Sequence, residues 1–431
     1  NNQQLDEVIV SDSKINVPFS KNFRSIEIIS SSDIIKSGAS NIIDLLQQSV
    51  GLDIRRRGAG WVQADLYIRG GGFDQTLLLL DGMKMDDSQT GHHTLNMLIP
   101  IELIERVEII KGPAARIFGQ NAFNGAINIV TKSAYKTRKG EFSAFLNNIS
   151  GGSFGNFKYS VRGNISKDNY KGLINYSREK SNGYRYNTDY KTDNLFLKSS
   201  LSKNNPNTIV LATLSNRKFG ANGFYASPDA TDQYEETQTS LIGIYSRYSS
   251  GNLIIKPKIY WRRNQDEYIY VRSDPSIYRN LHKTNKISAE VNFNYISSIG
   301  NTGFGIDFSN VSISSNNLGN HKRSITSLYV NHIFSLINEK LTLSPGISFS
   351  YFSDLSSNSF PGIDLGYNVS EKIKLYGNFG KTFRIPTYTD LYYSDRTTIG
   401  NSELEPESAV STEFGFKYNS SIFILKAAIF S

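Results

Sequence analysis

The chain of 431 residues contains no cysteine, three methionines, two tryptophans and eleven prolines. The lack of cysteine excludes disulfide scaffolds, thiolate metal sites and cysteine nucleophiles within these residues. Long apolar runs are also missing: the four leucines at 77–80 fall far short of the ~20 residues that a membrane-spanning helix requires. The composition therefore argues against a helical membrane protein and against cysteine-based chemistry.

Positive charge exceeds negative charge, with 47 Lys and Arg against 39 Asp and Glu, a net charge of +8. A basic protein raises the question of nucleic-acid binding, which concentrates Lys and Arg on one surface. Here the basic residues stand singly between aromatic residues and serines, and no Lys/Arg tract is longer than Arg55–Arg57. This dispersal indicates solvated charge and does not favour a nucleic-acid partner.

Apolar and polar residues alternate with a period of two over most of residues 141–431. In ISAEVNFNY at 287–295, for example, every second residue is apolar and those between are polar or small. Successive side chains of a strand point to opposite faces, so each such segment predicts a strand with one apolar and one polar face. The segments are about ten residues long, which matches a tilted bilayer crossing better than the shorter strands of soluble sandwiches.

About fifteen such strands are predicted, and their connections alternate in length. Short turns such as 203–206 and 249–251 alternate with long polar loops at 180–193, 216–239, 263–285, 311–324 and 384–408. Short turns on one rim and long loops on the other are typical of an outer-membrane barrel. An odd strand count cannot close an antiparallel barrel, and the last run, 422–430, would be an unpaired edge. We therefore expect an antiparallel transmembrane β-barrel that is incomplete at its C-terminal end.

Residues 1–132 have a different pattern, which predicts a small α/β domain. Ser31-Ser32-Asp33 can cap a short helix, and Asn41–Gln48 has apolar residues at helical spacing before Gly51. Short β runs follow at 65–69, 75–80, 104–110 and 125–130, separated by glycines. Large barrels enclose a lumen that can be plugged, so we expect this domain to lie inside the barrel.

Several motifs resemble TonB-dependent outer-membrane receptors. They are LDEVIV at 5–10, which resembles a TonB box, DLLQQSVGLDI at 44–54, LYIRG at 66–70, LLLLDG at 77–82, IERVEIIKGPAARIFGQNAFNGAINIVTK at 104–132 and GNSELEPESAVSTEFGFKY at 400–418. Further stretches resemble the cobalamin receptor-like branch found in Bacteroidetes: DSQTGHHTLN at 87–96, FGANGFYASPDATDQYEET at 219–237, YRNLHKT at 278–284 and FRIPTYTDLYY at 383–393.

The resemblance implies a TonB-box segment and linker at 1–20, a plug domain at 21–135 and a barrel at 136–431, which would have 22 strands in full. It also implies active import across the outer membrane of a Gram-negative bacterium, with energy from TonB and its inner-membrane complex. The TonB contact would be Leu5, Asp6, Glu7, Val8, Ile9 and Val10, whose alternation suits strand addition to a partner's sheet edge. The sequence leaves open whether a surface lipoprotein caps the barrel.

Ligand contacts are expected at the plug apices and in the long barrel loops. The apical candidates are Gly71, Gly72, Phe73, Asp74, Asp87, Ser88, Gln89, Thr90, His92 and His93. The loop candidates are Phe219, Phe224, Tyr225, Tyr234, Arg384, Tyr392 and Tyr393, whose aromatic rings suit a flat, amphipathic ligand. An aromatic girdle at the membrane rim is the alternative explanation for the tyrosines and phenylalanines.

The adjacent pair His92-His93 stands near Asp86 and Asp87, a combination that could hold zinc or iron. Adjacent histidines in extended backbone rarely reach one ion, so ligand contact or plug–barrel packing is favoured. Asp189 and Asp193 are candidate ligands of a structural calcium ion, with solvated carboxylates as the alternative. No resident cofactor is expected.

Four charged residues of the plug, Arg69, Glu105, Arg106 and Glu108, are expected to form buried ion pairs between plug and barrel, because an unpaired charge is costly there. No catalytic motif is recognisable, so an enzyme is not expected. Three functions remain open: a TonB-dependent importer of cobalamin or a related corrinoid, the same machine for a ferric siderophore or haem, and a passive porin or surface adhesin.

Overall fold

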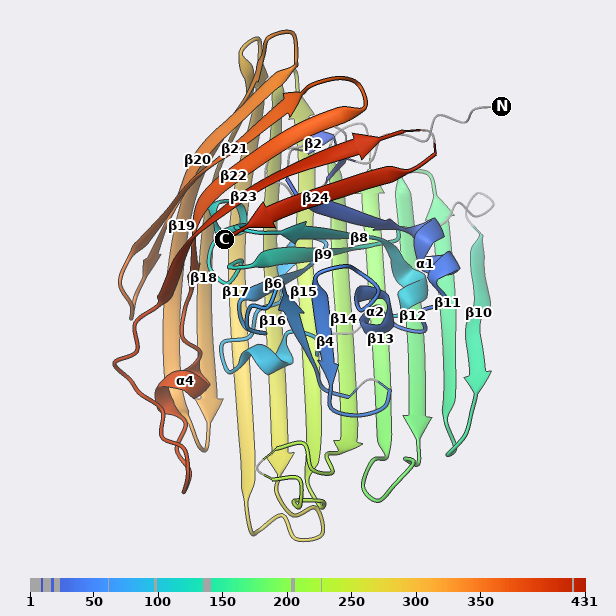
Figure 1. Cartoon of the computed structure of the whole chain (residues 1–431). Coiled ribbons are helices and arrows are strands. Elements are labelled where there is room, and N and C mark those ends of the chain that lie inside the picture. Colours follow the sequence, from blue (N-terminus) through green and yellow to red (C-terminus); the bar gives the residue numbers. More distant parts are fainter. Residues whose placement is uncertain are drawn as a thin grey trace.

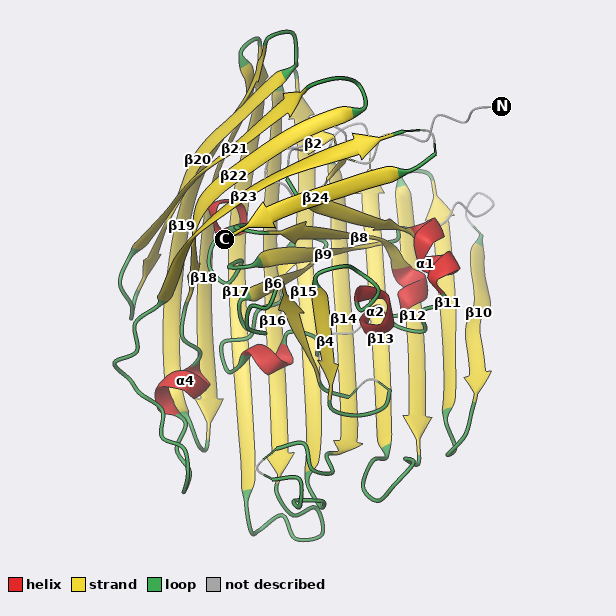
Figure 2. Cartoon of the chain, viewed as in Figure 1, coloured by secondary structure: helices red, strands yellow, loops and turns green. Residues whose placement is uncertain are grey.

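The computed structural model of the protein describes residues 9–10, 17–18, 24–60, 62–96, 99–134, 141–202, 206–225, 227–420 and 422–431. One large curved sheet forms a wall around a smaller mixed domain, the plug (Figure 1). Figure 2 shows that strands dominate and that the few helices are short. Within the described residues, no helix is long and apolar enough to cross a membrane.

The large sheet has fifteen strands, and each pairs antiparallel with its neighbours in chain order from β10 to β24. The strands are β10 (Phe142–Gly151), β11 (Phe157–Lys167), β12 (Tyr170–Ser181), β13 (Tyr190–Ser202), β14 (Asn207–Gly220), β15 (Tyr234–Ser250), β16 (Leu253–Ile269), β17 (Arg279–Ser297), β18 (Gly300–Ser315), β19 (Gly319–Leu336), β20 (Leu341–Phe352), β21 (Asn358–Asn368), β22 (Ile373–Arg384), β23 (Glu407–Asn419) and β24 (Ile424–Phe430). The predicted antiparallel barrel architecture is confirmed. β10 and β24 are the two edges of the sheet.

The alternation assigns the two faces of this wall. On β17, Ser288, Asn292 and Asn294 are buried against the interior, whereas Ile287 and Tyr295 are 54% and 51% exposed on the outer face. Polar residues therefore face the plug and apolar residues form an outer band, the reverse of a soluble protein. This arrangement is the one that a lipid-facing barrel requires.

Two of the five segments predicted as long loops, 263–285 and 311–324, are mostly strand. β16 continues to Ile269, and β17 already begins at Arg279. Only residues 316–318 separate β18 from β19. The prediction was wrong here because it required an apolar face. Beyond the apolar band both faces are polar, but the backbone groups still pair with the neighbouring strand.

The plug has a five-stranded sheet in the order β3-β8-β9-β6-β7, in which only β6 and β9 pair in parallel. Its elements are β3 (Ile26–Ser30), α1 (Ser31–Ser37), α2 (Ile42–Leu46), β4 (Leu52–Arg56), β5 (Ala64–Ile68), β6 (Thr76–Leu80), β7 (Met83–Lys84), the 3-10 turns η2 (Gly91–His93) and η3 (Ile101–Leu103), β8 (Ile104–Lys111), α3 (Ala115–Phe118) and β9 (Gly125–Thr131). The predicted mixed α/β plug inside the barrel is confirmed.

Local signals in the sequence explain the plug helices. Ser30, one residue before the predicted cap, caps α1 in a reciprocal capping box with Asp33, and Gly38 ends the helix in the left-handed conformation at φ 67°. Asn41 caps α2, whose buried residues join the largest apolar cluster. That cluster also includes barrel residues such as Phe196 and Leu241, so plug and barrel share one core.

The outer apolar band provides a direct test of membrane orientation. Ile306 lies opposite Val291 in the middle of the band and is 43% exposed. We expect Ile306→Lys to destabilise the folded protein in lipid bilayers by about 2–4 kcal/mol, because a cation at the midplane loses hydration. Denaturant titration of protein folded into phosphatidylcholine vesicles measures this difference.

Asn310→Lys is the matched control, since Asn310 lies on the same strand and face but at the edge of the band, opposite Ile287. It should cost no more than about 1 kcal/mol. Equal effects of the two substitutions would contradict the assignment of the outer face to lipid.

Candidate functional site

Four charged residues between positions 81 and 87, the anchor segment, each form an ion pair with the barrel wall. The pairs are Asp81–Lys198 on β13 (2.8 Å), Lys84–Asp307 on β18 (2.7 Å), Asp86–Lys286 on β17 (2.5 Å) and Asp87–Arg262 on β16 (2.8 Å). All eight side chains are at most 17% exposed. Burial alone would raise the pKa of Asp81, but Lys198 and Thr131 hold it below its usual value. The anchor segment thus joins the plug to four barrel strands.

A second group of ion pairs fixes the plug to the later strands. Asp364 on β21 accepts from both Arg24 (2.9 Å) and Arg116 of α3. Arg69 pairs with Glu413 on β23 at 2.5 Å, so this residue has the plug–barrel role expected of it. Ion pairs therefore attach the plug both to strands β13 and β16–β18 and to the later strands β21 and β23.

The other three residues expected in plug–barrel ion pairs are Glu105, Arg106 and Glu108, and the structure places them differently from Arg69. Arg106 and Glu108 bind each other at 2.7 Å within β8 of the plug, and Glu105 is exposed. The ladder between β8 and β9 shifts register between Ile104 and Arg106, which turns Glu105 away from the regular alternation. For Glu105 the expected burial was wrong, because periodicity alone did not reveal this bulge.

Three apical candidates for ligand contact are buried against the barrel. Asp87, Gln89 and His93 are 4–6% exposed. The Gln89 amide donates to Asp266 (2.8 Å), and the His93 ring nitrogen Nε2 lies 3.2 Å from the same carboxylate. These residues attach the plug to β16 and have little surface for a ligand.

The long connection after β22 also lies on the plug. It contains α4 (Tyr388–Tyr392), capped by Thr387 in a capping box with Asp390. The backbone N–H groups of Tyr388 and Thr389 donate to the carbonyls of Ser88 (2.8 Å) and Gln89 (3.1 Å). Arg384, at the start of this connection, binds Asp74 of the plug as well as Asp390 and Glu407. Ser88, Asp74 and Arg384 therefore hold a barrel loop onto the plug.

An apical aromatic strip remains partly exposed on the plug. Phe73 and His92 stack with ring centroids 4.1 Å apart and planes at 16°, and Tyr67 meets Phe73 edge-on at 6.1 Å. The Arg55 guanidinium lies 4.5 Å above the Tyr67 ring. His92 Nδ1 lies 2.7 Å from Asp65, which orients the imidazole. The strip combines flat apolar surface with hydrogen-bonding groups.

The glycines beside this strip form a tight turn. Gly70 has φ 79°, in the left-handed region, and Gly71 N donates to Ile68 O. A Cβ on Gly71 would lie 1.4 Å from the Asn124 side-chain nitrogen, and Gly72 N donates to Gln75. Gly71 and Gly72 thus place Phe73. Thr90 accepts from the His92 backbone N–H and so positions the other stacked ring.

The predicted aromatic residues of the barrel loops fall into two sets. Phe219 and Phe224 are buried with Val62 and Tyr190, so they pack between loop and plug. Tyr225 donates to Gln63 (2.5 Å) and to Glu235. This first set therefore links the loop after β14 to the plug.

The second set lies at the barrel mouth and keeps partial exposure. Tyr234 is covered by the Arg272 guanidinium at 4.5 Å, and Tyr392 stacks on His321 with centroids 3.7 Å apart. The Tyr393 hydroxyl lies 3.4 Å from the hydroxyl of Tyr278. These tyrosines remain candidates for ligand contact.

The proposed calcium ligands have cationic partners. Asp189 receives two hydrogen bonds from Arg272, and Asp193 receives one from Arg178 and one from Tyr176. In the parts of the chain that the structure describes, no group of three or more His, Cys, Asp or Glu residues could hold a metal ion. Both carboxylates thus have a guanidinium neighbour. His92 and His93 also have separate partners, Asp65 and Asp266.

Of the TonB-box residues, Leu5, Asp6, Glu7 and Val8 lie outside the described residues. Ile9–Val10 forms the short strand β1, which pairs antiparallel with β2 (Val17–Pro18). β2 lies at the rim with the short turns, opposite the rim that carries α4 (Figure 1).

Sequence patterns did not identify Asp65, Tyr67 and Arg55 as members of the strip. Alternation along β5 places Asp65 and Tyr67 on one face, and this much can be read from the sequence. The β4–β5 register brings Arg55 opposite Asp65, and Asp53 opposite Tyr67. That register depends on the fold and has no sequence signal of its own.

Two sequence families match the chain. The model of the TonB-dependent receptor plug domain matches residues 20–126, and that of the TonB-dependent receptor-like β-barrel matches residues 126–431. The chain belongs to the TonB-dependent receptor family. It is accordingly a transport receptor of the outer membrane of Gram-negative bacteria.

Curated relatives extend over almost the whole chain. The vitamin B12 transporter BtuB of Vibrio vulnificus is 24% identical over 99% of this chain and 70% of its own length. The vitamin B12 transporter BtuB of Photobacterium profundum is 24% identical over 95% of this chain and 66% of its own length. The chain thus spans roughly two thirds of each relative.

Solved structures show the same fold at lower identity. The ferric enterobactin receptor PfeA of Pseudomonas aeruginosa has a TM-score of 0.78 at 16% identity. This match covers 98% of this chain and 72% of the PfeA chain. The ferric yersiniabactin uptake receptor FyuA of Yersinia pestis has a TM-score of 0.74 at 15% identity. This match covers 95% of this chain and 72% of the FyuA chain. These matches establish the fold and leave the ligand open.

The Asp87–Arg262 pair provides a test of plug anchoring. Both side chains are at most 2% exposed, so Asp87→Ala leaves a buried guanidinium without its carboxylate. We expect the opening free energy of the plug to fall by about 3–5 kcal/mol. Hydrogen–deuterium exchange of residues 81–96 measures it.

Asp87→Ala combined with Arg262→Met should recover most of this loss, because the double variant removes both charges. Asp53→Ala, which breaks the exposed pair with Arg55, should leave exchange unchanged. An Asp87→Ala variant with wild-type exchange would contradict the anchoring role.

Because the titratable residue His93 lies against Asp266 of β16, we expect the attachment of the plug to the barrel to depend on pH. Burial alone would lower the pKa of His93, but the Asp266 carboxylate, with smaller effects of Asp87 and Glu235, raises it above its usual value. A raised folded-state pKa contributes stability that is complete below the unfolded pKa of about 6.5 and is lost as the pH rises through the folded value. Protection of residues 87–96, corrected for intrinsic exchange, should therefore fall as the pH rises above about 6.5 and through the raised folded-state pKa.

His93→Gln should remove this pH dependence, because a neutral amide can replace a hydrogen bond but not the titrating charge. A pH profile that stays unchanged in the variant would assign the titration to another group.

Proposed function

We propose that this receptor imports cobalamin or a related corrinoid to the periplasm with energy delivered by TonB. The observation that carries the proposal is the apical aromatic strip, a flat and partly exposed surface on the plug, whose neighbours Asp74 and Ser88 contact the connection that contains α4. A corrinoid is a large, flat and amphipathic ligand, for which stacked rings with polar edges are suitable contacts. The names of the curated relatives support the same ligand.

The charges near the strip favour a corrinoid over a ferric siderophore, the second candidate. An anionic ferric chelate needs cations that are free to bind it. Arg384 already binds three carboxylates, Arg57 donates to the Phe224 carbonyl and Arg55 pairs with Asp53. Ligand capture through flat contacts therefore fits this surface better than capture through positive charge.

The plug topology suits energy transfer from the N-terminal side. β3 is the edge strand of the plug sheet, and its one neighbour in that sheet is β8. A pull from the TonB-box segment first reaches Arg24, bound to Asp364, and then the β3–β8 ladder from its Ile26 end. The ladder can open pair by pair, so a modest force can remodel the plug while the rest of its core stays packed.

Binding measurements test the ligand. Purified full-length receptor should bind cyanocobalamin with a dissociation constant in the nanomolar range. Phe73→Ala and His92→Ala should each weaken binding by about tenfold, as loss of an aromatic anchor does at an interface. Tyr170→Ala is the matched control, since Tyr170 is an exposed aromatic residue of the barrel wall next to the short β11–β12 turn.

Removal of residues 5–10 separates binding from transport. This variant should bind cyanocobalamin normally and fail to take it up in cells that contain TonB. A receptor that ignores cobalamin but binds a ferric chelate would establish the siderophore alternative. Uptake that persists without residues 5–10 would instead indicate a passive pore.

A further inference from the structure

A buried hydroxyl group joins the barrel to the plug directly after β14. Tyr225 extends this hydroxyl to Gln63 of the plug (2.5 Å) and to Glu235 near the start of β15. Gln63 and Glu235 are each 3% exposed, so bulk water has little access to either side chain. Residues 221–225, the latch segment, are thus fastened to the connection between β4 and β5 of the plug.

The latch segment also holds the hairpin that carries part of the aromatic strip. Arg57 of the plug donates to the Phe224 carbonyl, and the Phe224 ring shares a buried apolar cluster with Val62. β4 and β5, which flank this connection, supply Arg55 and Tyr67 to the strip. The position of the strip therefore depends on the attachment of the latch segment.

The junction has more acceptors than its one hydroxyl proton can serve. A tyrosine hydroxyl donates one hydrogen bond, whereas the Gln63 oxygen Oε1 and an ionised carboxylate only accept. Tyr225 lies against both acceptors, so one further proton has to come from Glu235 in its acid form. Gln63 Nε2, the donor end of the same amide, is buried without a hydrogen-bond partner among the described residues. The arrangement therefore fits a protonated Glu235.

A second buried carboxylate explains why Glu235 keeps this proton. Asp266 of β16 lies opposite Thr237, which makes it a diagonal neighbour of Glu235 on the inner face. Burial alone would raise the pKa of Asp266, but His93, with Nε2 at 3.2 Å, holds it below its usual value. Burial, and then the charge of Asp266, raise the pKa of Glu235 from 4.5 to about 7. Of the two carboxyl groups, Asp266 is therefore the ionised one.

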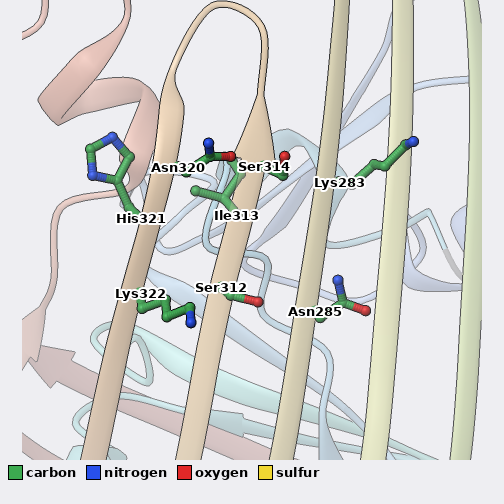
Figure 3. Close-up of a pocket in the computed structure, with 8 residues that line it drawn as sticks. All are labelled: Lys283, Asn285, Ser312, Ile313, Ser314, Asn320, His321 and Lys322. Carbon is green, nitrogen blue, oxygen red and sulfur yellow. The ribbon is translucent and has the colours of Figure 1, made fainter.

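Other charged groups face Glu235 from several elements. They are Arg217 of β14, Asp266 and Tyr268 of β16, His93 of the plug and Tyr225 of the latch segment, with Arg57, Asp87 and His282 behind them. Figure 3 shows a separate polar cavity of about 510 Å³, whose Lys283 and Lys322 lie on β17 and β19. Neither strand is next to β15 in the sheet, so these two lysines do not face Glu235.

We propose that Tyr225 and Glu235 form a proton-operated latch, which is closed when Glu235 is neutral and loosened when Glu235 is ionised. In the closed state Glu235 donates its acid proton to the Tyr225 oxygen, and Tyr225 donates its own to Gln63 Oε1. When the Glu235 proton leaves to water, one hydroxyl proton remains for two acceptors, and a second negative charge lies beside Asp266. Opening of the latch segment relieves both, because water can then solvate the carboxylate. The latch does not depend on which ligand the receptor imports.

The direction of the pH dependence follows from linkage between closure and proton binding. Closure raises the pKa of Glu235, so the closed state binds the proton more tightly than the open state. The contribution to closure is complete below the ordinary pKa of 4.5 and is lost as the pH rises through about 7. Within this window the closing equilibrium should change about tenfold per pH unit.

Hydrogen–deuterium exchange of residues 221–225 tests the latch in the full-length receptor in phosphatidylcholine vesicles. After correction for intrinsic rates, protection should fall about tenfold between about pH 5.5 and 6.5 and level off above about pH 7.5. Glu235→Gln should keep the low-pH protection at every pH, because its amide donates to Tyr225 and does not titrate. Tyr225→Phe should lower protection at pH 5.5 to the level of the wild-type receptor at alkaline pH.

Glu236→Gln is the matched control, since Glu236 is the next residue on the opposite face and pairs with Lys218. This variant should keep the wild-type profile. His93→Gln should move the transition at residues 221–225 to higher pH, because a cation that favours ionised Glu235 is lost. A wild-type profile without pH dependence, or an unchanged profile in Glu235→Gln, would overturn the proposal. A shift to lower pH in His93→Gln would also overturn it.

Discussion

Charge pairing between the plug and the barrel wall is the interaction on which the structure depends. The interior face of the barrel is polar, and the plug carries Asp, Lys and Arg residues into it, where each unpaired charge would be costly. Asp81, Lys84, Asp86 and Asp87 find opposite charges on four strands, and Asp364 binds two arginines on another side. These pairs fix the orientation of the plug, and the apolar core that plug and barrel share adds to the attachment.

The same contacts divide the molecule into a fixed part and an accessible part. His93, Gln89 and Asp87 lie against β16, and Arg384 holds the connection that contains α4 onto Asp74. Between these attachments, Tyr67, Phe73 and His92 keep exposed ring surface toward the long-loop rim. Strand β2, which pairs with Ile9–Val10, lies at the opposite rim (Figure 1). A ligand and a pulling partner can therefore act on the plug from opposite ends.

The outer wall follows a separate physical rule from the lumen. Its apolar band meets lipid and is bounded by rows of polar residues in which most charges have partners. The barrel wall thus has two surfaces of different chemistry, a polar inner face that meets the plug and an apolar outer face that meets lipid.

The sequence by itself determined the antiparallel barrel, its two faces, the α/β plug and the family, because period-two alternation and local motifs depend only on neighbouring residues. It did not reveal that polar segments such as 263–269 continue as strand, since backbone pairing does not require an apolar face. Only the tertiary structure separated buried His93 from partly exposed His92, and brought Arg55, Tyr67 and Phe73 together. Those outcomes depend on strand register and on charges hundreds of residues apart, for which a local pattern carries no information.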